Sequence, residues 1–256
     1  MQNTVMLRGL AVGEGMPKII VSVSEKTEDA ILRKTQEILE TRPDAVEWRA
    51  DHFAGLFDKD AVVSVLGGLR RILSDTPLLF TVRTEREGGA ADPGPKRYAE
   101  ILRTAADSGF ADAVDVEVFM DERMAEETIE AVHAAGIPVV ASNHDFHRTP
   151  EKEEIIRRLC RMQELGADIL KIALMPVSGE DVLTLLTATH EMKTRFASRP
   201  LITMSMGAEG VVSRVSGEVF GSAMTFGAVG QASAPGQLPV GELRKALDIL
   251  HRGMAG

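Results

Sequence analysis

Lys171 is the residue of this sequence whose surroundings most clearly suggest covalent chemistry. It lies between Leu170 and Ile172 in DILKIALM, and it is the only lysine of the chain in a strongly apolar, strand-like segment. A charged amine is costly to bury there, and the neutral amine is the form that attacks a carbonyl carbon. The alternative is a lysine paired with a buried carboxylate such as Glu117. Position alone leaves both interpretations open.

His144 is the candidate for proton transfer. It lies near the end of the segment PVVASNHD, one predicted strand before Lys171. Histidine can take up and return a proton near neutral pH. His52 is the main rival because it also lies at a strand end, and a structural role is the alternative for either histidine. We favour His144, since neighbouring strand ends converge on one pocket.

Three arginines follow three different predicted strands: Arg49, Arg83 and Arg214. Each could form a salt bridge with a glutamate, namely Glu47, Glu87 or Glu117. Together their guanidinium groups offer the paired donors that suit a carboxylate or a hydroxylated anion. Acidic residues interleaved with arginines, and the lack of a paired-histidine motif such as HExxH, give little support for a metal site. No glycine-rich phosphate loop follows the last two strands, which disfavours phosphorylated substrates.

Eight short apolar segments, most of them followed by a stretch with helical periodicity, must position these residues. They are KIIVSVS from Lys18, AVEWRAD from Ala45, PLLFTVR from Pro77, AVDVEV from Ala113, PVVASNHD from Pro138, DILKIALM from Asp168, PLITMSMG from Pro200 and AMTFGA from Ala223. Strands that alternate with helices are parallel, and eight such units favour a closed (β/α)₈ barrel over an open sheet. The absence of GxGxxG after the first strand weakens a dinucleotide-binding fold.

Local signals predict how individual elements begin, end and pack. Two apolar stripes predict helices that face the sheet: Ile31, Leu32, Thr35, Ile38 and Leu39 in one, and Ile155, Leu159 and Met162 in the other. Pro150 is predicted at the first position of a helix, and Gly109 and Gly166 as C-terminal caps. Residues 1–16 precede the first strand, and their apolar positions predict a short hairpin that closes the barrel floor: Leu7, Leu10 and Val12. We interpret residues 1–256 as a single barrel domain.

Composition excludes several classes of protein. With 44% hydrophobic residues the chain can bury a core, and the formal charge of −9 argues against nucleic acid or an anionic membrane surface as a partner. No segment reaches the roughly 20 apolar residues that span a membrane. The N-terminus lacks the features of a signal peptide. The single cysteine, Cys160, cannot form an internal disulfide and lies in a helical pattern, so we expect a cytoplasmic protein.

The sequence resembles the type I 3-dehydroquinate dehydratase family, also called type I 3-dehydroquinases. The motifs that carry the resemblance occur in the family's order between about Gly13 and Gln237: GEGMPKIIVS, VEWRAD, TVRTEREGG, SNHDF, LKIA, MSMG, SRVSGEVFGSAMTFG and ASAPGQ. The resemblance implies a (β/α)₈ barrel that converts 3-dehydroquinate to 3-dehydroshikimate in the shikimate pathway, without metal or external cofactor. It also implies a homodimer.

The same resemblance implies roles for individual residues. Lys171 forms an imine with the C3 ketone, His144 removes the C2 proton and helps expel the C1 hydroxyl as water, and Glu87 orients His144. The positions that match substrate-binding residues of the family are Ser22, Glu47, Arg49, Arg83, Arg214, Ser233 and Gln237. Arg214 would hold the substrate carboxylate. Met204 and Phe226 match apolar walls of the pocket, and we assign no role to Asn143.

Two alternatives belong to other functional classes. A class I aldolase would use the same lysine, but usually needs phosphate-binding glycines near the last strands, and these are not evident. A barrel without catalytic activity would act as a binding or scaffolding protein, although the sequence holds a full set of groups for chemistry. Assembly state and the direction of metabolic use, biosynthesis or quinate breakdown, do not follow from the sequence.

Overall fold

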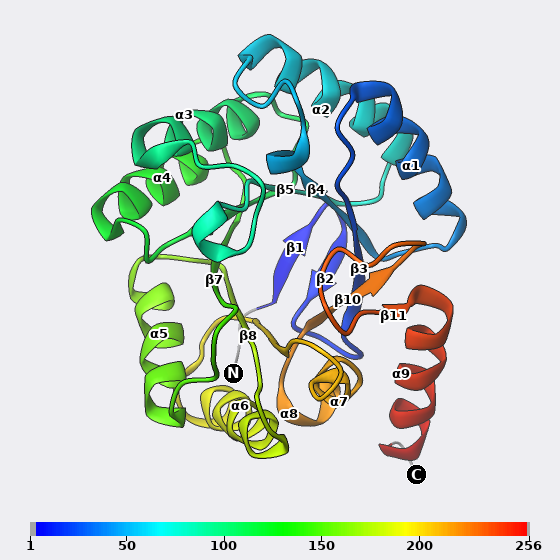
Figure 1. Cartoon of the computed structure of the whole chain (residues 1–256), viewed down its shortest axis with the longest axis vertical. Helices are drawn as coiled ribbons and strands as arrows, with labels where there is room; N and C mark the ends of the chain where they lie inside the picture. The colour runs from blue at the N-terminus through cyan, green and yellow to red at the C-terminus, as the bar shows by residue number, and fades with distance from the viewer. Residues whose placement is uncertain (1–3, 255–256) are drawn as a thin grey trace.

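A parallel sheet curls into a barrel at the centre of the molecule (Figure 1). The computed structural model describes residues 4–254. The barrel strands are β3 (Lys18–Val23), β4 (Ala45–Arg49), β5 (Leu78–Thr81), β6 (Ala113–Glu117), β7 (Val139–Asp145), β8 (Ile169–Leu174), β9 (Leu201–Ser205) and β10 (Met224–Ala228). They are neighbours in chain order, β10 also pairs with β3, and the short β11 (Leu238–Pro239) extends β10. The amide of Ala223 donates to the carbonyl of Leu201 at 2.7 Å, which joins β10 to β9 and completes the ring.

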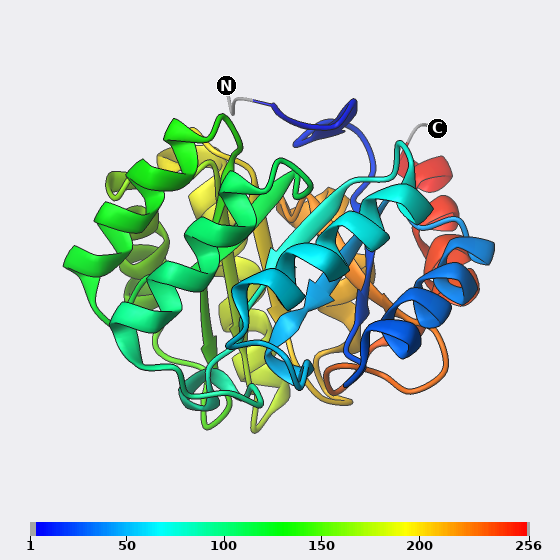
Figure 2. The ribbon, with the colours of Figure 1, turned by 90° about the horizontal axis from the view of Figure 1, so that it is seen from above.

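Helices surround this sheet on its outer side (Figures 1 and 2). They are α1 (Glu28–Glu40), α2 (Lys59–Leu73), α3 (Gly94–Asp107), α4 (Glu122–Ala134), α5 (Lys152–Glu164), α6 (Gly179–Glu191), α7 (Val211–Val215), α8 (Gly217–Phe220) and α9 (Val240–Met254). Shorter helical turns are η1 (Ala50–His52), η2 (Glu85–Glu87) and the π-helical η3 (Met192–Phe196). The predicted (β/α)₈ barrel is confirmed. No described helix is long and apolar enough to cross a membrane.

The predicted apolar stripes face the sheet. In α1, Ile31, Thr35 and Ile38 are buried, and Leu32 and Leu39 are partly buried against the same core. In α5, the three predicted positions are fully buried: Ile155, Leu159 and Met162. Cys160 lies beside this stripe, with its Sγ 3.8 Å from the sulfur of Met192. These contacts anchor α5, from which the side chains of Arg157 and Arg158 extend.

The predicted helix boundaries are partly confirmed. Gly109 and Gly166 follow α3 and α5 with φ of 71° and 93°, the left-handed conformation expected of C-terminal caps. The prediction for Pro150 was wrong, because α5 begins at Lys152. Glu151 caps the helix with an extended backbone (φ −56°, ψ 150°), so helical geometry starts only after it.

An antiparallel hairpin of β1 (Val5–Leu7) and β2 (Leu10–Val12) closes the barrel floor, as predicted. Val5, Leu7 and Val12 are buried, and they form one apolar cluster with residues inside the barrel such as Ile20. Arg8 fixes the hairpin tip through an ion pair of 2.8 Å with Asp112. Figure 2 shows the hairpin at the end of the barrel opposite the loop that follows β10. The hairpin therefore leaves the carboxyl ends of the strands free for a site.

Candidate active site

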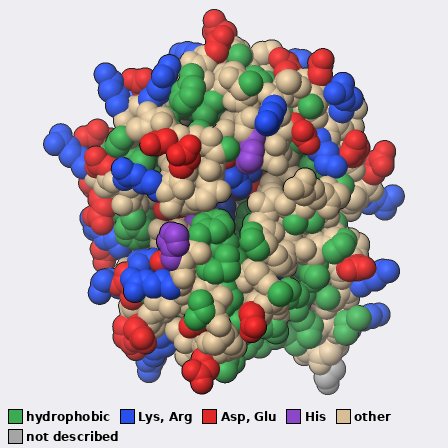
Figure 3. All heavy atoms as spheres, viewed as in Figure 1, with side chains coloured by type: hydrophobic (Ala, Val, Ile, Leu, Met, Phe, Trp, Pro, Cys, Tyr) green, Lys and Arg blue, Asp and Glu red, His purple; other side chains and the backbone are tan. Residues whose placement is uncertain are grey.

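A pocket of about 260 Å³ opens at the carboxyl ends of the strands. Figure 3 shows this face, hollowed near its centre, with basic side chains visible in the hollow. The residues that line the pocket come from strands and loops all around the barrel: Ser22, Glu47, Arg49, Arg83, Glu87, Gly88, His144, Phe146, Lys171, Ala173, Met204, Met206, Phe226, Ser233, Ala234, Pro235 and Gln237. Every site residue predicted from the sequence lines it except Arg214, which lies directly behind the wall.

Lys171 is buried at the bottom of this pocket, with 3% of its surface exposed. Its Nζ lies 2.9 Å from Asp115 Oδ2, 3.4 Å from Glu47 Oε1 and 4.9 Å from the ring centroid of Phe226. Both readings of its position therefore hold together: it is a buried lysine with carboxylate partners, and it faces a cavity. The suggested partner Glu117 was wrong, because Glu117 pairs with Arg83 instead.

Arg83 organises the carboxylates below the pocket. Its guanidinium donates to Asp115 at 2.8 Å, to Glu117 at 2.9 Å and to the hydroxyl of Ser142 at 2.9 Å. Burial alone raises the pKa of Asp115, but Arg83 and Lys171 outweigh it and lower that pKa to about 2. Arg83 therefore donates hydrogen bonds mainly to residues of the protein itself. A contact between Arg83 and a substrate stays a prediction.

His144 and Glu87 form a hydrogen-bonded pair at one side of the pocket. Glu87 Oε2 lies 2.9 Å from His144 Nδ1 and accepts from the His144 backbone amide at 2.9 Å. Glu87 Oε1 accepts from the side-chain amide of Asn143 at 3.0 Å. Glu87 ends η2, and the tight turn that follows holds its carboxylate beside His144. Gly88 makes this turn with φ 80°, and a side chain at that position would collide with the ring of Phe146.

Electrostatics keep the imidazole neutral. Burial lowers the pKa of His144 well below its usual range, and the charges of Arg83, Lys171 and Arg49 add to this effect. Burial and the charge of Glu117 raise the pKa of Glu87 to about 8, although Arg83 and Asn143 oppose the rise. A neutral imidazole beside an ionisable carboxyl group is suited to accept a proton.

The other predicted binding residues form polar contacts with one another or with neighbouring residues. Arg49 donates from Nε and Nη2 to Asp51 at 2.9 and 2.8 Å. The hydroxyl of Ser22 donates to Glu47 at 2.5 Å. Ser233 and Gln237 bond to each other across the loop after β10, with the Gln237 amide donating to Ser233 at 3.0 Å.

Arg214 is a buried cation that forms no ion pair with a carboxylate among the described residues. Its Nη2 donates to the carbonyl of Pro235 at 2.7 Å, and its buried Nε has no hydrogen-bond partner among the described residues. Burial lowers the pKa of Arg214 to about 10, so the side chain is still cationic at neutral pH. A buried guanidinium with a free donor has the chemistry to bind an anionic group.

Sequence reasoning did not identify all the residues around the pocket. His52 lies 3.5 Å from Asp51 and does not line the pocket. Asp115 lies in the predicted strand AVDVEV, but the sequence did not identify it as the partner of Lys171. Its spacing of two residues from Glu117 indicates that both face the barrel interior. Asn143 received no role, yet it holds Glu87.

Comparison with known proteins agrees with this geometry. The model of the type I 3-dehydroquinase family matches residues 19–254. Proteins described as 3-dehydroquinate dehydratase from Salmonella agona and Salmonella typhimurium are each 51% identical over 250 residues, which cover 98% of this chain and 99% of theirs.

Solved structures give the same result. The type I 3-dehydroquinate dehydratase of Clostridium difficile, described with covalently modified comenic acid, is 44% identical with a TM-score of 0.96, covering 99% of this chain and 100% of that one. The enzyme of Geobacillus kaustophilus is 38% identical with a TM-score of 0.94, covering 98% and 97%. The chain therefore belongs to the type I 3-dehydroquinase family of hydro-lyases.

Proposed function

We propose that this protein dehydrates 3-dehydroquinate to 3-dehydroshikimate, within the shikimate pathway, through a Schiff base on Lys171. The observation that carries the proposal is a buried lysine that faces a pocket together with the His144–Glu87 pair. The curated relatives are named for this activity, and the similarity to this chain extends over nearly their full length. The covalently modified ligand described for the Clostridium difficile enzyme also supports covalent chemistry in such a site.

In the proposed reaction, the amine of Lys171 first gives up a proton and then attacks the C3 ketone, and loss of water leaves a protonated imine. The imine withdraws electrons from C2, so His144 can remove the C2 proton. The enamine then expels the C1 hydroxyl, which leaves as water with the proton that His144 returns. Hydrolysis of the imine releases 3-dehydroshikimate and restores the amine.

The remaining groups orient the substrate in this proposal. Arg214 holds the carboxylate, because it is the buried cation with a free donor. Glu47, Arg49 and Gln237 hold ring hydroxyls, and Met204 and Phe226 enclose the ring. The proposed binding set also includes Ser22, Arg83 and Ser233. Ser22 donates a hydrogen bond to Glu47, and Arg83 donates one to Glu117 below the pocket.

The test of the proposed function is the appearance of the enone absorbance of 3-dehydroshikimate when the purified protein is mixed with 3-dehydroquinate. A class I aldolase would instead release carbonyl fragments from aldol substrates, and a binding barrel would show neither change. Absence of the absorbance with folded protein would contradict the proposal.

Replacing Arg214 with alanine should raise KM about tenfold to a hundredfold, because the substrate carboxylate loses a charge-assisted partner in a partly dry site. Arg214→Lys should raise KM less, because lysine keeps the positive charge but lacks the paired donors of the guanidinium group. Arg195→Ala is the matched control, because Arg195 is an exposed arginine of η3 that pairs with Glu191. An unchanged KM and kcat/KM for Arg214→Ala would remove this residue from the site.

Activity should rise with pH and level off above about 8, because the pKa of Glu87 is raised to about 8. Below that pH the carboxyl group is protonated, so it is a weaker acceptor for His144 Nδ1 and can instead donate its own proton to that nitrogen. Above it, the carboxylate accepts a hydrogen bond from the protonated Nδ1, and Nε2 stays unprotonated as the base. The measurement is kcat/KM against pH, which reports groups of the free enzyme. The glutamine of Glu87→Gln does not titrate, so this variant should lose the rise of kcat/KM with pH, here called the acid limb. An acid limb that persists unchanged in the variant would contradict the assignment.

We also propose a cytoplasmic homodimer. Exposed apolar side chains on α7, α8 and α9 offer a surface for a second copy: Val212, Val219, Ile249, Leu250 and Met254. Light scattering of the purified protein should give twice the mass of one chain, and a monomeric mass at micromolar concentration would contradict this part of the proposal.

A further inference from the structure

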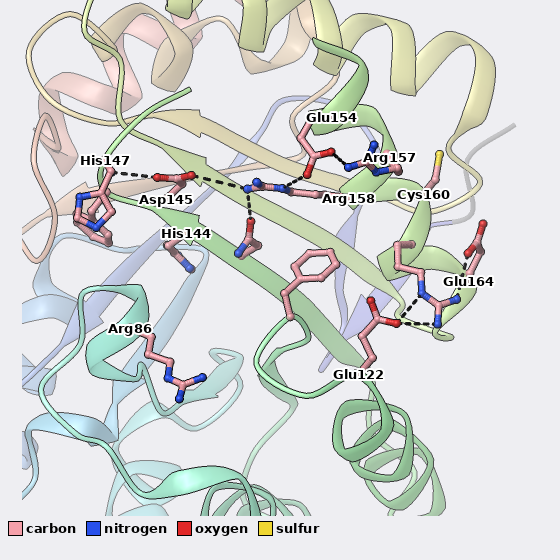
Figure 4. A pocket seen from close by; sticks show the side chains of 14 residues that line it. Arg86, Glu122, His144, Asp145, His147, Glu154, Arg157, Arg158, Cys160 and Glu164 are labelled. Atoms are coloured by element: carbon pink, nitrogen blue, oxygen red, sulfur yellow. Dashed lines mark hydrogen bonds and ion pairs between the residues drawn. The ribbon is translucent and has the colours of Figure 1, made fainter. Parts of the chain in front are cut away.

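A second hollow, of about 750 Å³, opens beside α5 on the outer side of the barrel and shares His144 with the site (Figure 4). Arg158 of α5 extends along it between Glu154 and Asp145, with 19% of its side chain exposed. Its Nε donates to Glu154 at 2.7 Å, and its Nη1 donates to Asn143 Oδ1 at 3.0 Å. A charged side chain outside the barrel therefore contacts a residue of β7.

This contact fixes the orientation of the Asn143 amide. Arginine can only donate hydrogen bonds, so the atom that faces Arg158 must be the amide oxygen. The amide nitrogen then points the other way and donates to Glu87 Oε1 at 3.0 Å. Asn143 is 8% exposed, which leaves it little freedom to turn over.

The orientation of Asn143 in turn determines what Glu87 can offer to His144. One carboxylate oxygen, Oε1, already accepts from Asn143, and the other, Oε2, accepts from the His144 backbone amide. Arg83 Nη1 also lies 3.5 Å from Oε2, too far for a close hydrogen bond. An ionised carboxylate therefore satisfies the donors that bond to it, and Oε2 has an acceptor lone pair left for Nδ1. The imidazole then carries its proton on Nδ1 and presents an unprotonated Nε2.

We propose that Asn143, oriented by Arg158 from outside the barrel, is a positioning residue that sets the tautomer of His144 through Glu87. This inference rests on the proposed function, in which His144 removes a proton. It extends the site beyond the pocket to a surface arginine of α5.

The charges around Glu87 explain why an uncharged donor matters there. The carboxyl group faces Glu117 and Asp115 of β6, which favour its neutral form together with burial. Arg83, at the end of β5, and Asn143 favour the ionised form. Around His144, the cations that face the ring are Arg83, Lys171 of β8 and Arg49 of β4. Loss of the Asn143 donor should therefore move the pKa of Glu87 further upward.

The first test compares Asn143→Asp with Asn143→Ala. The aspartate keeps the contact with Arg158 but places an acceptor against Glu87 Oε1, so it should be the more severe change. We expect kcat to fall about tenfold to a hundredfold, with KM within about twofold, because a hydrogen bond to a charged group is lost away from the substrate. The acid limb of kcat/KM should move to higher pH in both variants, and further in Asn143→Asp.

Arg158→Met supplies a second variant that does not alter the barrel wall. It should lower kcat and shift the acid limb in the same direction as Asn143→Ala, and it should add little in the Asn143→Ala background. Arg157→Met is the matched control: Arg157 is the preceding residue of α5 and also pairs with Glu154, but it is 78% exposed. If Arg158→Met and Arg157→Met have equal effects, or if Asn143→Ala leaves kcat and its pH profile unchanged, the proposal is overturned.

The tautomer itself can be measured without substrate. In protein with nitrogen-15-labelled histidine, above about pH 8, the ring signals of His144 should show a protonated Nδ1 and a free Nε2 in the wild type. Asn143→Asp should shift the population away from this form. A wild-type ring protonated on Nε2 would overturn the inference, whatever the activity. If the tautomer is as expected but no dehydration occurs, the failure lies in the proposed function alone.

Discussion

Replacing Lys171 with alanine is expected to abolish dehydration while the barrel stays folded. No other residue that lines the pocket in the described part of the chain has a primary amine, so imine formation has no substitute. The cost in folding should be moderate, roughly 1–3 kcal/mol, because the apolar strand accepts alanine. Asp115 keeps partners in Arg83 and Ser142 when the lysine is removed.

Borohydride added with 3-dehydroquinate should reduce the imine and leave a stable adduct on the peptide that contains DILKIALM. Lys18→Ala is the matched control, because Lys18 begins β3 at the opposite end of the barrel and donates to the carbonyl of Glu14. It should keep both turnover and labelling. Recovery of the label on another lysine, or its absence in an active protein, would disprove the covalent role of Lys171.

Replacing His144 with alanine should lower kcat by at least ~10²–10⁴-fold, the usual contribution of general acid–base catalysis. The imine should still form in part, since Lys171 remains. Glu87→Gln should be milder, because the amide can still bond the ring but cannot stabilise an imidazolium. The decisive measurement is exchange of the C2 hydrogen of the substrate in deuterated water, compared for the two variants.

His147→Ala is the control for this prediction. His147 lies three residues beyond His144 but outside the pocket, exposed, with its backbone amide bonded to Asp145. It should exchange the C2 hydrogen at the wild-type rate. If His144→Ala also does so, a group other than His144 is the base, and the assignment is wrong.

The architecture could be predicted from the sequence because its signals are local. Apolar β-branched runs alternate with helical periodicity, and the eight predicted strands match β3 to β10 to within about two residues at either end. The carboxyl ends of the strands converge in such a barrel, and this rule predicted that Lys171, His144 and the arginines lie close together. Pro150 shows the limit of such signals: it was predicted at the first helical position, but Glu151 is not helical and α5 begins only at Lys152.

The partners of each side chain could not be predicted in the same way. Periodicity indicates the face of a strand on which a residue lies, but not the neighbouring acceptor that it reaches. Asp115 and Glu117 share a face of β6, yet only Asp115 contacts Lys171, because Glu117 is held by Arg83 and Thr84.

The sequence by itself therefore determined the barrel, its floor hairpin and the residue types at the site. Only the tertiary structure decided the pairings within that site, including Asn143, whose importance depends on a residue fifteen positions away on α5. The physical reason is that strand order and helical stripes follow from periodicity along the chain. Hydrogen-bond partners instead depend on distances of a few ångströms between segments that are remote in sequence.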